Sequence, residues 1–224
     1  LEGLLTISLH EIVQASHRRE EILRRHARER ELTEGVLFAG GGISTWALAQ
    51  GLKDAGYRTR CEWILDRDGR YLESAIRNIP VIGRETRIFE ATVEEIAPTL
   101  VPPVDILSAS LPCTNFSRSG ISKKGLERPE DDENANTGFV GLLGIVRAVN
   151  PSIIVHENVP PFAGSATCRV LVSILRKLGY VVQERILGRE LGAFERRDRH
   201  ILLATSAGMA RHFDLARVAP SVVP

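Results

Sequence analysis

The chain has 224 residues, of which 43% are hydrophobic and 25% are charged. This length and composition indicate one soluble α/β domain with a single core. No apolar run reaches the length of a membrane span, and the first twenty residues show no secretory signal. The 29 basic and 28 acidic residues give a net charge of +1, so charge alone does not indicate a nucleic-acid partner.

The first predicted element is an N-terminal amphipathic helix. Ser8 to Glu11 has the form of a capping box, and apolar residues recur at helical spacing towards Arg30. Arginines interleave with glutamates along this segment. The segment therefore presents either a phosphate-facing patch or, as is commoner, a solvated and salt-bridged surface.

A glycine-rich turn follows the first predicted strand. The apolar run from Val36 breaks at Gly40–Gly42 and then continues into a helical pattern. Glycines at a strand-to-helix turn let a cofactor approach the backbone, and the helix start offers unpaired N–H groups. The spacing differs from the dinucleotide fingerprint, so an ordinary glycine turn stays an open alternative.

Acidic residues end the next two predicted strands. Arg58–Leu65 is predicted as a strand, and Asp66 follows it at a position suited to ribose hydroxyls. A solvated turn aspartate is the alternative. Thr86–Phe89 is strand-like and is followed by Glu90.

A cysteine follows the strand predicted at Val104–Leu107. Ligands collect at the carboxyl ends of strands in a doubly wound sheet, which makes Cys113 a candidate nucleophile. A free cysteine of this kind is more often an inert core residue. The segment from Arg118 to Thr137 lacks periodicity and is predicted as a long mobile loop.

The second half of the chain continues to alternate helix and strand. A helix is predicted at Gly138–Val149, and the strand beginning at Ile153 leads into Glu157, which either holds a proton or caps the following loop. Further predicted elements are a helix at Arg169–Leu178, a strand at Tyr180–Leu187 and an apolar run at Ile201–Ala204. Alternation of this kind indicates a parallel sheet.

Two arginines precede the last apolar run. If they lie on a strand, Arg197 and Arg199 share one face and can hold anionic or carbonyl oxygens. A charged edge-strand face is the alternative. Cys61, Cys113 and Cys168 form an odd set without metal-ligand spacing, which favours free thiols in a reducing cytosol and argues against a zinc site.

Taken in order, these elements resemble the motif series of the DNA (cytosine-5) methyltransferases. The resemblance runs from about Thr33 to Thr205 and is most specific at Pro112-Cys113 and at Glu157-Asn158-Val159. It implies a Rossmann-like class I fold, with a mostly parallel seven-stranded sheet and helices on both faces. It also implies methyl transfer from S-adenosylmethionine to carbon-5 of cytosine in DNA through a covalent cysteine adduct.

The resemblance implies a role for each matching residue. Cys113 adds to carbon-6 of the base, Glu157 stabilises ring nitrogen-3, and Arg197 contacts the base carbonyl with Arg199 as its neighbour. No metal is implied. The implied cofactor-binding residues are Phe38, Gly40, Gly42, Asp66, Glu90 and Pro112.

The sequence departs from the family pattern at Ile43, Thr114 and Glu195, and it stops where a target-recognition domain follows in relatives. We therefore expect residues 1–32 to form the N-terminal helix and residues 33–224 a catalytic domain, in a fragment or processed chain. Sequence recognition is expected from missing sequence or a second subunit. The N-terminal helix is expected to supply the layer that completes the cofactor pocket.

Three alternatives accompany this interpretation. A tRNA cytosine-5 methyltransferase shares the same motifs, and a non-catalytic methyltransferase-like regulatory subunit shares the fold. A nicotinamide oxidoreductase is disfavoured by the glycine spacing. The expected partner is DNA with a flipped cytosine, under the loop after Cys113, in a bacterial or phage-type restriction-modification setting. The expected location is the cytoplasm, on the nucleoid when DNA is bound.

Overall fold

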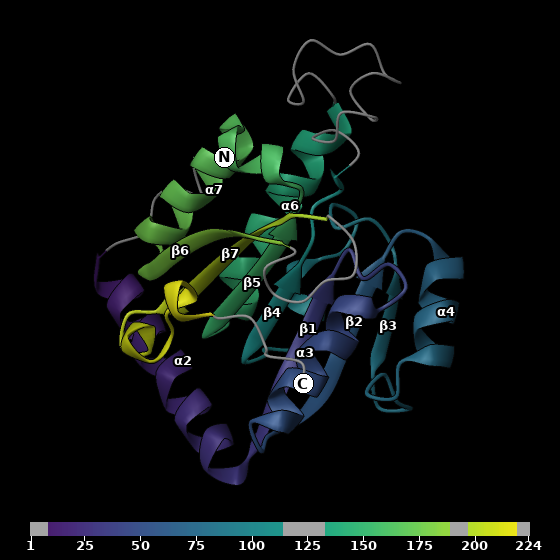
Figure 1. Cartoon of the computed structure of the whole chain (residues 1–224), viewed down its shortest axis with the longest axis horizontal. Coiled ribbons are helices and arrows are strands. Elements are labelled where there is room, and N and C mark those ends of the chain that lie inside the picture. Colours follow the sequence, from purple (N-terminus) through teal and green to yellow (C-terminus); the bar gives the residue numbers. More distant parts are fainter. Residues whose placement is uncertain (1–8, 114–132, 189–196, 219–224) are drawn as a thin grey trace.

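A computed structural model of the chain describes residues 9–113, 133–188 and 197–218. They form one seven-stranded sheet in the order β3-β2-β1-β4-β5-β7-β6 (Figure 1). The first five strands pair in parallel, whereas β7 runs antiparallel to both β5 and β6. The strands are β1 (Glu31–Leu37), β2 (Arg58–Asp66), β3 (Arg87–Glu90), β4 (Ile106–Ala109), β5 (Ile153–Asn158), β6 (Tyr180–Leu187) and β7 (Arg199–Ser206).

Helices connect the strands and cover both faces of the sheet, so the predicted mostly parallel α/β fold is confirmed. The α-helices are α2 (Leu9–Glu29), α3 (Ile43–Asp54), α4 (Gly69–Asn78), α6 (Glu133–Val149) and α7 (Ala166–Lys177). Short 3-10 helices are η1 (Pro98–Leu100), η4 (Pro160–Gly164), η6 (Ala210–His212) and η7 (Leu215–Arg217).

Strand alternation divides the core between the two faces. On one face, Leu37 and Leu107 pack with the buried residues of α6 and α7. On the other, Leu32 and Ile106 pack with α2 and α3, while α4 covers Ile64. Central strands buried on both faces explain the near-continuous apolar runs in the sequence.

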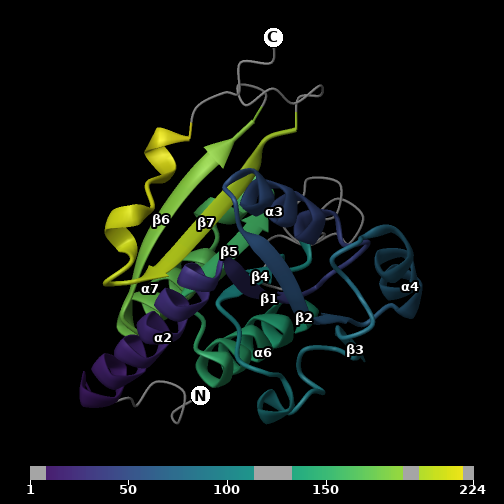
Figure 2. The same ribbon diagram turned by 90° about the horizontal axis from the view of Figure 1, so that it is seen from below.

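The helix predicted at the N-terminus is present as α2, but the position expected for it was wrong. Its residues contact the amino ends of the strands. The hydroxyl of Ser152, just before β5, donates to the Arg19 carbonyl. The His26 Nδ1 lies 2.7 Å from the Oδ2 of Asp105, just before β4. Figure 2 shows α2 beside β6 and β7. The glycine turn predicted to bind the cofactor lies after β1, at the opposite edge, so α2 does not cover that turn.

Several element boundaries differ from those predicted. Helix α6 begins at Glu133, so the last part of the loop predicted to reach Thr137 is helical; residues 114–132 lie outside the described part. Helix α4 was not predicted, although Asp68 caps it by accepting from the Arg70 N–H. None of the helices described is long and apolar enough to cross a membrane.

Candidate active site at the carboxyl edge of the sheet

The glycine turn between β1 and α3 has a backbone that requires glycine. Gly40 and Gly42 have φ angles of 51° and 79°, and Phe38 is also left-handed at 56°. A Cβ on Gly42 would lie 2.7 Å from the Ile79 side chain, whereas a Cβ on Gly40 would meet nothing within 4 Å. The turn is therefore closely packed at Gly42 and open at Gly40. Helix α3 starts here without a side-chain cap, which leaves its first N–H groups to a ligand.

Asp66 at the end of β2 braces this turn. Its Oδ2 accepts the Gly40 N–H at 2.8 Å, and its Oδ1 accepts the Asp68 N–H at 3.0 Å. Both carboxylate oxygens thus accept hydrogen bonds from backbone N–H groups. The direct contact with the ribose that was predicted for Asp66 stays a prediction. Glu90 is the register partner of Asp66 on β3 and is exposed. The two carboxylates end neighbouring strands at the same edge.

Cys113 lies just past β4, and both it and Pro112 are exposed to solvent. The segment before it is fixed from β5: buried Asn158 donates its side-chain N–H to the Leu111 carbonyl at 3.0 Å. The Asn158 side-chain oxygen Oδ1 accepts the Val159 N–H at 2.9 Å. The sequence pattern gives no role to Asn158, although this residue lies within the Glu157-Asn158-Val159 motif. Its contacts join the β4 exit to the end of β5.

Glu157 and Arg199 meet across β5 and β7. The Arg199 Nε lies 2.5 Å from the Glu157 Oε1, and both side chains are partly exposed. Arg197 is exposed and precedes β7, which starts at Arg199. The expectation that the two arginines share one strand face was therefore wrong, because strand alternation does not extend back to Arg197. The structure pairs Arg199 with the Glu157 carboxylate, and the contact of Arg197 with the base carbonyl stays a prediction. Thr114 and Glu195 lie outside the described residues.

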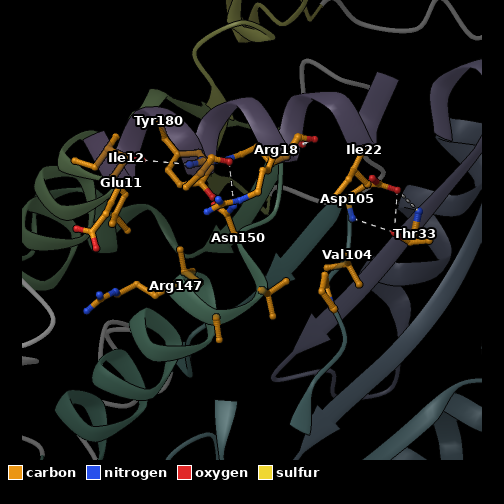
Figure 3. A pocket seen from close by; sticks show the side chains of 18 of the residues that line it. Glu11, Ile12, Arg18, Ile22, Thr33, Val104, Asp105, Arg147, Asn150 and Tyr180 are labelled. Atoms are coloured by element: carbon orange, nitrogen blue, oxygen red, sulfur yellow. Dashed lines mark hydrogen bonds between the residues drawn. The ribbon is translucent and has the colours of Figure 1, made fainter. Parts of the chain in front are cut away.

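A cavity of about 480 Å³ lies at the opposite edge of the sheet, between α2 and the amino ends of the strands (Figure 3). It contains none of the predicted site residues. Beside it, Asp105 Oδ2 accepts from the N–H and the hydroxyl of Thr33, both at 2.8 Å. Arg19 lies over the Tyr180 ring, 4.4 Å from its centroid. These contacts hold α2 to the sheet, and the predicted site residues lie at the other edge.

The comparisons with known proteins agree with the motif assignment. Residues 36–217 match the family model described as C-5 cytosine-specific DNA methylase. The chain is 31% identical over 172 residues to the type II methyltransferase M.NlaX of Neisseria lactamica, covering 75% of this chain and 50% of that protein. It is 30% identical over 114 residues to M.HhaI of Haemophilus parahaemolyticus, covering 49% and 33%. The chain thus spans half or less of these relatives.

Solved structures show the same fold. S. pombe Dnmt2 methyltransferase has a TM-score of 0.60 at 19% identity, covering 86% of this chain and 57% of that one. A putative DNA modification methyltransferase from an E. coli prophage has a TM-score of 0.65 at 16% identity, covering 86% and 52%. A putative class I S-adenosylmethionine-dependent methyltransferase from Listeria monocytogenes has a TM-score of 0.57 at 12% identity, covering 97% and 65%. With the family model covering most of its length, the chain belongs to the C-5 cytosine-specific DNA methylase family.

Proposed function

We propose that this chain transfers a methyl group from S-adenosylmethionine to carbon-5 of cytosine in DNA, with Cys113 as the nucleophile. The observation that carries the proposal is the arrangement around Asn158. This residue connects the Cys113 segment to the strand end that holds the Glu157–Arg199 pair. An exposed thiol, a carboxylate and a guanidinium thus belong to adjacent strand ends at the edge where ligands bind in α/β sheets.

The glycine turn fits an S-adenosylmethionine site. The space above Gly40 is open, and the start of α3 offers N–H groups without a side-chain cap. Phe38, Gly40, Gly42, Asp66, Glu90 and Pro112 would hold this cofactor, which supplies an electrophilic methyl group when bound. Asp66 acts by fixing the turn, because its carboxylate already holds Gly40.

Each catalytic residue then has one chemical task. The Cys113 thiolate adds to carbon-6 and pushes electron density towards carbon-5, which otherwise is a poor nucleophile. Glu157 acts as the acid: its carboxyl O–H donates a hydrogen bond to ring nitrogen-3 and stabilises this density, and Arg199 orients the carboxyl group through their contact. Arg197 serves the base carbonyl. After methyl transfer a base removes the carbon-5 proton, and the carbon–sulfur bond breaks to release the thiolate. No metal takes part.

The substrate is DNA with the target cytosine turned out of the stack, because carbon-5 and carbon-6 must be reached from the base's faces. Recognition of a DNA sequence is assigned to segments beyond the described residues or to a second subunit. The names of the relatives favour a restriction-modification role in a bacterial or phage setting. The corresponding place of action is the cytoplasm, on the nucleoid.

Covalent trapping tests the nucleophile. The chain is incubated with labelled S-adenosylmethionine and a duplex library containing 5-fluorocytosine, whose fluorine cannot leave as a proton. A labelled protein–DNA adduct is expected, and Cys113→Ala should abolish it. Cys61→Ala is the matched control, since Cys61 is buried within β2 and should leave trapping intact. Unchanged trapping in Cys113→Ala would reject the nucleophile.

Side-by-side substrates test the choice of nucleic acid. Methyl incorporation is measured into duplex DNA and into tRNA with the same enzyme preparation. Incorporation into DNA is expected, and incorporation into tRNA alone would assign the chain to the tRNA enzymes. Calorimetric binding of S-adenosylmethionine without incorporation into either would indicate a regulatory subunit.

A further inference from the structure

We propose that Cys168, Glu184 and His200 form a binding site for a divalent transition metal of the zinc type, apart from the reaction centre. Cys168 lies in the first turn of α7, Glu184 in β6 and His200 in β7. Their sulfur, carboxylate oxygen and imidazole nitrogen atoms all lie within 4.8 Å of one another. These three donor types are the ones that Zn²⁺ takes in proteins.

The interatomic distances suit a shared metal. The Cys168 Sγ lies 3.4 Å from the Glu184 Oε2, and the His200 Nε2 lies 3.0 Å from the same oxygen. Bonds of about 2.3 Å to sulfur and about 2.0 Å to oxygen and nitrogen place tetrahedral ligand atoms about 3.3–3.6 Å apart. The Cys168 sulfur and the His200 nitrogen lie within 4.8 Å of each other, so binding one ion needs an outward shift of the carboxylate and small side-chain rotations at Cys168 and His200. The thiol proton passes to solvent as the metal–sulfur bond forms.

The fold sets the backbone positions of two of the ligands, and the third is the most adjustable. Cys168 and His200 are each only 1% exposed, and the Cys168 N–H is held by the Ser165 hydroxyl at 3.0 Å. Glu184 and His200 lie two register positions apart on paired strands, hence on one face. The Glu184 side chain is 33% exposed and can move to meet an ion.

A solvent-open hollow beside α7 gives access to the site. Cys168 and Glu184 line it, so a water molecule can fill a fourth coordination position. Three basic residues also line this hollow: Arg169, Arg176 and Lys177. Thiolate and carboxylate together neutralise a divalent ion, so the bound site presents no net positive charge to these neighbours.

The site is separate from the proposed reaction centre. His200 follows Arg199 on β7, and successive strand residues point to opposite faces, so the metal ligands face away from the Glu157–Arg199 pair. The ion would tie α7 to β6 and β7 near the start of β7. The sequence concealed this group because its members are 16 residues apart, far from the short spacings that mark zinc sites.

Cobalt titration of the full 224-residue chain tests the proposal. Co²⁺ is expected to bind with one equivalent and to give a thiolate-to-metal charge-transfer band. Zn²⁺ should displace it, and Mg²⁺ should not. Zinc at a hundredfold excess over its dissociation constant should raise Tm by about 5 °C or more.

Variants locate the site. Cys168→Ser should abolish the band, and Glu184→Gln should weaken Co²⁺ binding by about 100-fold or more. Because Glu184 is partly exposed, that variant is expected to keep its fold, as circular dichroism will show. Cys113→Ala is the control for the exposed thiol and should keep both band and stoichiometry.

Two results would overturn the proposal. One is the absence of a charge-transfer band in the unmodified chain. The other is a band that survives in Cys168→Ser but is lost in Cys113→Ala. Neither result bears on methyl transfer, because Cys168 has no part in the proposed reaction.

Discussion

Glu34 is a carboxyl group buried in the middle of β1. Its Oε1 accepts a hydrogen bond from the Ser108 hydroxyl at 2.6 Å, while Oε2 has no hydrogen-bond partner within the described part of the chain. Burial raises the pKa of Glu34 to about 8 from its usual value of 4.5. The protonated form is therefore favoured in the native state, where the neutral group loses less hydration than the ion.

This burial predicts a pH-dependent stability. Between pH 4.5 and about 8 the native state holds a proton that the unfolded state has released, so stability falls as pH rises. Buried His156, with its pKa lowered to about 3 from 6.5, costs stability only below pH 6.5. Urea unfolding from pH 6.5 to 8 therefore isolates the effect of Glu34. Over this range the free energy of unfolding of the unmodified chain should fall by about 1–2 kcal/mol, and Glu34→Gln should remove this fall. Equal slopes for both proteins would contradict the assignment.

Arg199 illustrates how a motif can be found while its geometry is missed. The sequence placed both arginines on one strand and preferred Arg197 for the contact with the base carbonyl, which stays a prediction. The structure begins β7 at Arg199, so only Arg199 lies on the strand, where it pairs with Glu157. Strand ends depend on pairing with a neighbour, and spacing along one segment does not contain that information.

From the Glu157–Arg199 pair we expect that loss of Arg199 lowers the catalytic rate more than it lowers stability. Arg199→Ala should lower kcat/KM by about 10²-fold, because Glu157 loses its orientation. The free energy of unfolding should change by less than about 1 kcal/mol, since the pair is partly exposed. Arg217→Ala is the control, because it breaks an exposed pair with Asp214 away from the site. Similar kinetics for the two variants would refute the role.

At the scale of elements, the glycine turn shows what a sequence pattern can predict. The break from an apolar strand into three glycines predicted both the turn and the helix after it, and both are present. The pattern did not show which glycine is indispensable. That depends on Ala75 in α4 and on Ile79 just after this helix, which the sequence pattern does not predict.

Substitution of two neighbouring glycines tests which of them the turn requires. Gly42→Ala should cost about 2–4 kcal/mol of stability, because φ is 79° and the new Cβ would lie 2.7 Å from Ile79. Gly41→Ala, with nothing within 4 Å, should change stability by less than about 0.5 kcal/mol. Urea unfolding and calorimetric binding of S-adenosylmethionine measure both effects. Equal losses in the two variants would contradict the packing argument.

At the scale of the whole molecule, the sheet separates a binding edge from a structural edge. Periodicity predicted five of the seven strands within about two residues, β1 only as the apolar run from Val36, and β7 only as its apolar centre. It also predicted α2 as a helix but not its position. An amphipathic pattern shows that one side must be buried, and only tertiary packing decides which edge buries it. Here the contacts with Asp105 and Tyr180 fix α2 beneath the amino ends of the strands.

Because the binding edge and the structural edge are separate, we expect Arg19 to contribute to stability and not to cofactor binding. Arg19 is 3% exposed, lies over Tyr180 and donates to the Leu178 carbonyl at 3.4 Å, and burial lowers the pKa of its guanidinium. Arg19→Ala should cost about 1–3 kcal/mol, the loss of cation–π and carbonyl contacts being partly offset by relief of the buried charge. Exposed Arg18 supplies the control, and Arg18→Ala should change stability by less than about 0.5 kcal/mol.

The same variant tests whether the two edges are independent. Well below the Tm, Arg19→Ala should retain the unmodified chain's affinity for S-adenosylmethionine, since the glycine turn lies at the other ends of the strands. Calorimetry at low temperature measures this affinity, and thermal unfolding measures the stability. Weakened cofactor binding without loss of stability would mean that α2 acts on the carboxyl edge across the sheet, against the position that its contacts give it.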